Sequence, residues 1–183
     1  RQMCIRDSYQ GKQLRNATLN AIAPTGSISI IAGCSSGIEP LFSLSFTRTI
    51  LDGTKLFETH SLFEEALRAK GVYSEPLAAQ VRKNPSIQHI KTIPGEIKRL
   101  FVTAFDVTPV QHLKIQSAFQ KFTDNAVSKT VNLPPDATVD DVSKIYLMAH
   151  NLGCKGITVY RYGSRQAQVL TIEPAGEKDT QTN

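Results

Sequence analysis

Apolar residues recur at helical spacing in several stretches of the chain. Residues 59–70 (THSLFEEALRAK) gather their apolar side chains on one side of a helix and end before Gly71, which predicts an amphipathic helix. The pattern predicts shorter helices over 76–82 and 95–101. Between them, residues 84–94 contain two prolines and are expected to form a loop.

The clearest helix follows Thr108–Pro109, a capping residue and a proline at the first helical position. It is expected to run through 110–129. Its buried side is predicted to consist of Val110, Leu113, Ile115, Ala118, Phe119, Phe122 and Ala126. Thr138–Asp141 has the form of a capping box, which predicts another helix that continues to about Asn151 and is ended by Gly153.

Strands are predicted over 41–51 (LFSLSFTRTIL), 130–133 (TVNL) and 156–162 (GITVYRY). Helix and strand alternate in the second half of the chain, which argues for an α/β fold. Three or four strands are few for a closed α/β domain, so we expect a piece of something larger. A first residue of Arg1 rather than Met supports the same expectation.

Two stretches leave alternatives open. Residues 13–22 read equally as a short helix or as an extended run before Pro24. Over 24–40, the isoleucines favour a buried strand, whereas Thr25 as a cap and Gly33 as a stop favour a short helix. Composition does not decide between the two.

The two ends of the chain are expected to differ from the rest. Residues 1–8 (RQMCIRDS) lack periodicity, which fits a frayed end or foreign sequence. Residues 171–183 are polar without an apolar face, which predicts a disordered linker or tail. Residues 9–170 are then the folded part.

Composition narrows the functional classes. The 21 lysines and arginines exceed the 16 acids by a net charge of +5, but they are scattered, which is weak support for nucleic-acid binding. Three cysteines cannot all pair, so a disulfide scaffold is not expected and a reducing compartment is. No apolar run reaches the ~18 residues of a membrane span, so no membrane partner is predicted.

The turn after Pro24 carries candidate chemistry. A Thr-Gly-Ser run offers consecutive backbone N–H groups with the hydroxyls of Thr25 and Ser27 beside them, and Gly26 has no Cβ to keep an anion away. These features fit a phosphate cradle, although a plain structural turn has the same chemistry.

The other candidate residues have ordinary interpretations. Cys34 and Cys154 are expected to be buried, inert thiols. Tyr160 and Tyr162 lie two residues apart, so they share a strand face and are expected to pack there. The histidines lack i, i+4 spacing, so no metal site is predicted.

Two long strings carry a family resemblance. They are RNATLNAIAPTGSISIIAGCSSGIEPLFSLSFTR and FQKFTDNAVSKTVNLPPDATVDDVSKIYLMAHNLGCKGITVYRYGSR. Both resemble the late catalytic region of ribonucleotide reductases, in the family's order and approximate spacing. The resemblance covers 14–170 and is looser over 52–86.

The resemblance implies the C-terminal part of a ten-stranded α/β barrel of the ribonucleotide reductase type. In this family a finger loop with an Asn-x-Cys-x-Glu motif carries a radical cysteine. None of the three cysteines here has that motif, so no catalytic residue is expected in this chain, and the fragment is expected to be inactive alone.

The family's substrate-phosphate loop maps onto Pro24, Thr25, Gly26, Ser27 and Ile28. The resemblance therefore favours the phosphate cradle over the plain turn, and a helix from Ser27 onward over a strand. It also implies that Glu39 in the Ser-Gly-Ile-Glu-Pro string supports the barrel and this loop, without a chemical role of its own.

The subclass resembled is the adenosylcobalamin-dependent (class II) one. Class I large subunits have adjacent tyrosines in a radical relay, whereas Tyr160 and Tyr162 are separated by Arg161. The implied function is reduction of ribonucleotides to deoxyribonucleotides in the cytoplasm. Adenosylcobalamin would be the cofactor and a thioredoxin-type protein the reductant, with a nucleotide effector bound elsewhere in the full chain and a homodimer as one arrangement.

Two alternatives remain. A class I large subunit is the nearest within enzymes. A basic nucleic-acid-binding module is the alternative outside them; it rests on the pI of about 9.2 and lacks stacking aromatics and clustered basic residues.

Overall fold

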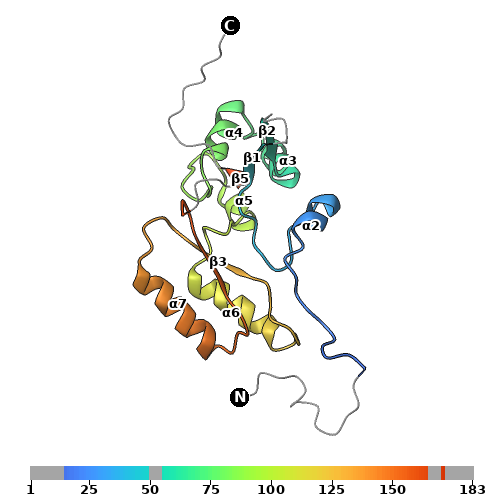
Figure 1. Cartoon of the computed structure of the whole chain (residues 1–183). Coiled ribbons are helices and arrows are strands. Elements are labelled where there is room, and N and C mark those ends of the chain that lie inside the picture. Colours follow the sequence, from blue (N-terminus) through green and yellow to red (C-terminus); the bar gives the residue numbers. More distant parts are fainter. Residues whose placement is uncertain (1–14, 50–54, 165–169, 172–183) are drawn as a thin grey trace. The chain divides into compact units, whose positions relative to one another are not determined.

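The computed structural model describes residues 15–49, 55–164 and 170–171 (Figure 1). The chain divides into two compact units. The first unit contains the described residues up to Pro40 and those from Val107 to Ser164. The second contains those from Leu41 to Asp106, together with 170–171.

A three-stranded antiparallel sheet organises the second unit. Strand β1 (Ser45–Thr49) lies between β2 (Lys55–Thr59) and β5 (Leu170–Thr171). In the register of the first pair, Ser45 faces Thr59. Strand β1 begins inside the predicted strand 41–51, whereas β2 was not predicted, because its five residues (KLFET) do not alternate cleanly between apolar and polar.

Three helices complete this unit: α3 (Ser61–Ala69), α4 (Glu75–Arg82) and α5 (Gly95–Leu100). All three confirm the sequence pattern to within two residues at each end. Their apolar faces close one core, which consists of Leu44, Phe63, Leu67, Leu77, Val81, Ile87, Ile90, Ile93 and Ile97. The second unit is therefore held together by conventional apolar packing.

The first unit contains a parallel strand pair. Strands β3 (Thr130–Leu133) and β4 (Thr158–Arg161) are joined by α7 (Val139–Asn151). Helix α6 (Pro109–Gln120) packs against both β3 and α7. The predicted capping box is present, with Thr138 and Asp141 bonded reciprocally. The small core of this unit consists of Leu113, Val131, Leu133, Ile145 and Ala149.

Helix α6 corrects two sequence-based expectations. It ends at Gln120 rather than continuing to residue 129. Its buried residues are His112, Leu113, Gln116, Ser117 and Gln120, so most of the predicted apolar face was wrong. Phe119 and Phe122 are instead 45% and 82% exposed. The reason is that the buried polar side chains bind backbone groups of neighbouring loops, which an apolar side chain cannot do.

The ambiguous stretches are now defined. Residues 15–22 form no helix, and Ile22 makes an isolated parallel bridge with Val127. Helix α2 spans Gly26–Ala32, so the helical alternative for this segment is confirmed. Residues 1–8 and 172–183 lie outside the described residues. Thr171, the first residue of the predicted tail, lies in β5 and pairs with Thr47 of β1.

Candidate functional site: a loop anchored at both ends

The predicted phosphate segment begins with an unusual backbone. Thr25, the N-cap of α2, has φ 53°, and it is the one non-glycine residue with positive φ in the described part of the chain. A β-branched residue rarely adopts this left-handed conformation, which costs on the order of 1–3 kcal/mol. Such strain persists only where the surrounding structure enforces it.

The first turn of α2 is open to solvent. Nothing lies within 4 Å of the position that a Cβ on Gly26 would occupy. Gly26, Ser27 and Ile28 are exposed, and the first-turn amides of a helix have no acceptor within the helix. The Thr25 side chain makes no capping hydrogen bond. The segment thus leaves its first-turn amides and the Ser27 hydroxyl exposed to solvent.

Helix α2 is not held by its apolar side chains. Ile28, Ile30 and Ile31 are 62%, 62% and 85% exposed, and Ser29 is the one buried residue of the helix. The Ser29 hydroxyl donates to Gly26 O at 2.8 Å. Within this chain, the position of the helix therefore depends on the segments that precede and follow it.

The segment before α2 is fixed to residues 122–128. Ser128 N donates to Ile22 O at 2.9 Å, beside the Ile22–Val127 bridge. Two residues upstream, Asn20 Oδ1 accepts from Asp124 N at 2.7 Å, and its amide donates to Phe122 O at 2.9 Å.

The segment after α2 returns against the same region. Gly37 has φ 52°, and a Cβ there would lie 3.1 Å from Ala23 O and 3.9 Å from Thr25 Oγ1. A side chain at Gly37 would therefore push the returning segment away from the entry of the loop. The close approach explains the small-residue turn that precedes Glu39.

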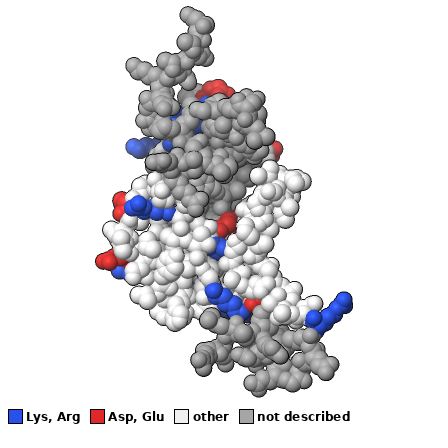
Figure 2. All heavy atoms as spheres, viewed as in Figure 1, with Lys and Arg blue, Asp and Glu red and all other residues white. Residues whose placement is uncertain are grey.

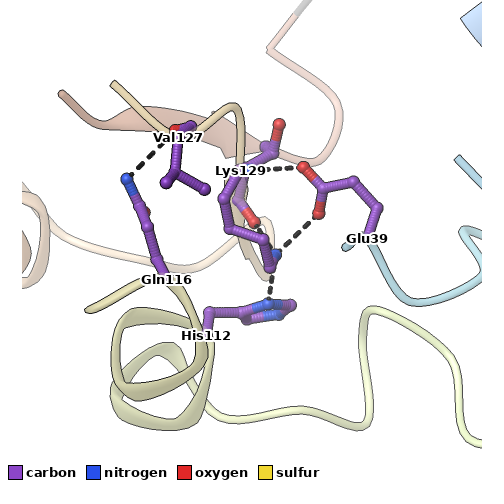
Figure 3. A network of polar contacts seen from close by, with 6 residues as sticks. Glu39, His112, Gln116, Val127 and Lys129 are labelled. Carbon is purple, nitrogen blue, oxygen red and sulfur yellow. Dashed lines mark hydrogen bonds and ion pairs between the residues drawn. The ribbon is translucent and has the colours of Figure 1, made fainter. Parts of the chain in front are cut away.

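Glu39 ends the loop in a polar network around buried Lys129, with the Glu39 side chain itself 23% exposed (Figure 3). Its Oε2 accepts from Lys129 Nζ at 2.6 Å, and its Oε1 accepts from Thr130 N at 2.5 Å. Lys129 and Thr130 directly follow Val127 and Ser128, the two residues that bind Ile22. Residues 122–130 therefore anchor the loop on both sides.

Lys129 is a buried cation, with its side chain fully covered. Besides Glu39, its Nζ contacts Thr130 O at 2.5 Å and His112 Nδ1 at 2.7 Å. Burial lowers the pKa of Lys129 below its usual value, and the hydrogen bond and charge of Glu39 oppose that shift. An ammonium has donors only, so His112 Nδ1 accepts and the ring proton lies on Nε2.

The polar face of α6 supports the neighbouring loops. Gln116 Nε2 donates to Gly156 O at 2.6 Å, and Ser117 donates to Leu152 O at 2.8 Å. Gln120 Nε2 donates to Asn125 O at 2.9 Å, within the anchoring segment 122–130. Sequence reasoning overlooked these residues and Lys129, because isolated polar residues in a helix or loop normally face solvent.

The remaining candidates play no part in this network. Cys34 is exposed, so the expected burial of its thiol is wrong; Cys154 is partly buried, which raises its pKa. Burial also raises the pKa of Tyr162, with a smaller contribution from Tyr160. Within 15–49, 55–164 and 170–171, no three His, Cys, Asp or Glu side chains form a group suited to a metal ion.

Comparisons with known proteins show the family. Residues 4–160 match the family described as ribonucleotide reductase, barrel domain. The chain belongs to this family. Its fold class, part of a ribonucleotide reductase α/β barrel, is thereby confirmed.

Among curated relatives, the chain is 49% identical over 92% of its length to the vitamin B12-dependent ribonucleoside-diphosphate reductase of Thermoplasma acidophilum. The protein of that name in Mycobacterium tuberculosis is 46% identical over 86% of the chain. The chain spans 22% of the length of each of these relatives.

A solved structure gives a related match. The Actinobacillus ureae class Id ribonucleotide reductase alpha subunit aligns with 81% of this chain at a TM-score of 0.67 and 27% identity. The chain covers 27% of that subunit. The family resemblance drawn from the two sequence strings is therefore confirmed.

The surface bears on the alternative of nucleic-acid binding. On the face drawn in Figure 2, acidic and basic side chains of the described residues are interspersed, with broad uncharged areas between them. A continuous basic stripe, the usual footprint of a nucleic-acid interface, is not seen among the residues described on that face. Within the same described residues, no helix is both long and apolar enough to span a bilayer.

Proposed function

We propose that this chain is the phosphate-binding portion of an adenosylcobalamin-dependent reductase that converts ribonucleoside diphosphates to deoxyribonucleotides. The names of the relatives from Thermoplasma acidophilum and Mycobacterium tuberculosis support the reaction, substrate and cofactor. The proposal also includes a thioredoxin-type reductant, a nucleotide effector site elsewhere in the full chain, homodimerisation and a cytoplasmic location.

The observation that carries the proposal is the start of α2. A strained Thr25, an open space at Gly26 and an exposed Ser27 combine to present amides and a hydroxyl at one point. Pro24, Thr25, Gly26, Ser27 and Ile28 are proposed to bind the substrate phosphates. Charge-assisted hydrogen bonds to such an anion are worth ~1.5–3 kcal/mol each.

The chain's contribution would be positioning. Fixing the phosphates would hold the ribose at a set distance from the radical cysteine. None of Cys4, Cys34 and Cys154 lies in the Asn-x-Cys-x-Glu motif that marks this cysteine in the family. Positioning of this kind can lower a barrier by several kcal/mol. Adenosylcobalamin, when bound, supplies the initiating radical. We assign the corrin to no described residue of this chain.

A class I large subunit is the second candidate, since the Actinobacillus ureae alpha subunit belongs to class Id by its name. The B12-dependent relatives are more similar, at 49% and 46% identity against 27%. The full-length protein is expected to reduce nucleoside diphosphates with adenosylcobalamin and a dithiol alone. Dependence on a metal-containing second subunit, without any need for the corrin, would assign it to class I.

The phosphate site is tested by substitution of Ser27 and Gly26 in the full-length enzyme. Ser27→Ala removes one hydroxyl and should weaken nucleoside diphosphate binding about tenfold, on the scale of one charge-assisted hydrogen bond. Gly26→Asp adds a like charge at the phosphate and should weaken binding much more. Neither change should affect the unphosphorylated nucleoside to the same degree.

Two variants make the test specific. Gly26→Ala places a methyl group in space that is empty in this chain, at a residue without positive φ, so it should fold normally and still obstruct the phosphate. Ser143→Ala removes an exposed hydroxyl from α7 and serves as the matched control for Ser27→Ala. Equal losses for nucleotide and nucleoside would mean that the loop shapes the barrel without binding phosphate.

A further inference from the structure

We infer that the buried Lys129–Glu39 pair is a clamp that holds the phosphate loop in its binding conformation, so that both residues are positioning residues for the substrate. The inference rests on the proposed function of residues 24–28. It assigns a role to a buried cation that contacts neither the loop amides nor the exposed Ser27 hydroxyl.

The first argument is the placement of the anchors. The loop begins after Ile22, which is bound by Val127 and Ser128. It returns at Glu39, which is bound by Lys129 and Thr130. Four consecutive residues therefore fix the distance between the two ends, and Gly37 permits the returning segment to approach Ala23 and Thr25 closely.

The second argument is that little else in this chain holds α2. Its three isoleucines are mainly exposed, so apolar packing does not fix the helix. The left-handed conformation of Thr25 must be maintained from outside the helix. The clamp, acting through Glu39 and the Gly37 contact, can supply that constraint.

The third argument is the cost of burying Lys129. A covered ammonium is unfavourable unless it is paired and its donors are bound. Here Glu39 Oε2, His112 Nδ1 and Thr130 O lie 2.5–2.7 Å from Nζ. An apolar residue could fill the same volume, but it could not form the directional hydrogen bond to Glu39 that fixes the end of the loop. A fully satisfied network is suited to setting one geometry.

Glu39→Gln is the central variant. Its single amide oxygen can accept from Thr130 N or from Lys129 Nζ but not from both, and the NH2 group then faces the remaining donor. The clamp therefore loosens with little change in volume. If the loop is then in its binding conformation about a tenth of the time, nucleoside diphosphate affinity should fall about tenfold. Affinity for the unphosphorylated nucleoside should be unchanged.

Lys129→Met removes the cation and should produce the same pattern. The matched controls are Glu96→Gln and Lys70→Met, which break an exposed ion pair of similar length, 2.7 Å, in the second unit. The controls should affect neither ligand. Hydrogen exchange supplies a readout that is independent of substrate. The amides of α2 should exchange faster in Glu39→Gln than in the wild type, whereas those of α7 should not.

The outcomes separate this inference from the proposed function. If Ser27→Ala weakens nucleotide binding but Glu39→Gln does not, the loop binds phosphate and the clamp is refuted. If neither variant distinguishes nucleotide from nucleoside, the phosphate site fails and the clamp's role in substrate binding fails with it. Should Lys129→Met not fold, Glu39→Gln and its hydrogen exchange still decide the matter.

Discussion

The interiors of the two units differ in how much of each is polar. In the second unit, nine apolar residues form one continuous core; they are Leu44, which precedes β1, and residues of the helices and of the loop between α4 and α5. In the first, α6 buries His112, Gln116, Ser117 and Gln120 beside a core of five apolar residues. The comparison shows two ways to hold an irregular loop: the loop between α4 and α5 buries three isoleucines, whereas the loops beside α6 are held by directed hydrogen bonds.

The polar interior belongs to the unit with the proposed site. Residues 122–130 lead from α6 into β3, and residues 152–156 lead from α7 towards β4. Neither segment is helical, so their backbone groups need other partners where they are buried. The glutamines of α6 supply those partners. An apolar core would let these loops shift, and the loop that they anchor would shift with them.

The comparison predicts the largest loss of stability in the apolar unit. Phe63 is 1% exposed and packs edge-to-face on Phe101 at a centroid distance of 5.2 Å. Phe63→Ala should destabilise the second unit by ~3–5 kcal/mol, because it removes buried area and leaves a cavity. Chemical denaturation of the full-length protein measures the loss, with Leu62→Ala, at an exposed position, as the control. Similar small losses in both variants would contradict the assignment of this core.

A smaller effect is expected for the polar face of α6. Gln116→Met preserves volume but leaves Gly156 O without its donor, which should cost ~1–3 kcal/mol. The loss should be accompanied by faster hydrogen exchange in 122–130. Gln111→Met, at an exposed position of the same helix, is the control. An unchanged or raised stability would mean that these hydrogen bonds do not determine the loop geometry.

The smallest effect is expected at the capping box of α7. Thr138→Ala should cost about 1 kcal/mol, because Asp141 N loses its side-chain acceptor. The hydrogen bonds from Thr138 lower the pKa of Asp141 below its ordinary value of 3.8. The stabilisation by the carboxylate is therefore complete above the ordinary pKa and is lost as the pH falls through the lowered one. The stability difference between wild type and variant should therefore narrow in acid. A constant difference from neutral pH to pH 2 would argue against the carboxylate's part in the cap.

Local sequence signals predicted the helices whose first turn contains a recognisable capping residue. Thr138 with Asp141, and Thr108 with Pro109, begin α7 and α6 where their chemistry indicated. The resemblance of the two long strings predicted the family, and it resolved residues 26–32 as a helix where composition had left strand and helix open. Capping and turn preferences act over a few residues, so the sequence displays them directly.

Only the tertiary structure decided which side of α6 is buried and what Lys129 does. Phe119 is an apolar residue at a plausible core position, yet it is exposed, because the groups facing α6 from the loops are carbonyls and amides. Glu39 and Lys129 lie 90 residues apart, and neither has a local pattern that indicates the other. The sequence by itself determined where the capped helices α6 and α7 begin. The pairing of distant charges depends on where the folded chain places them, because a buried ammonium is stable only beside a partner that the fold supplies.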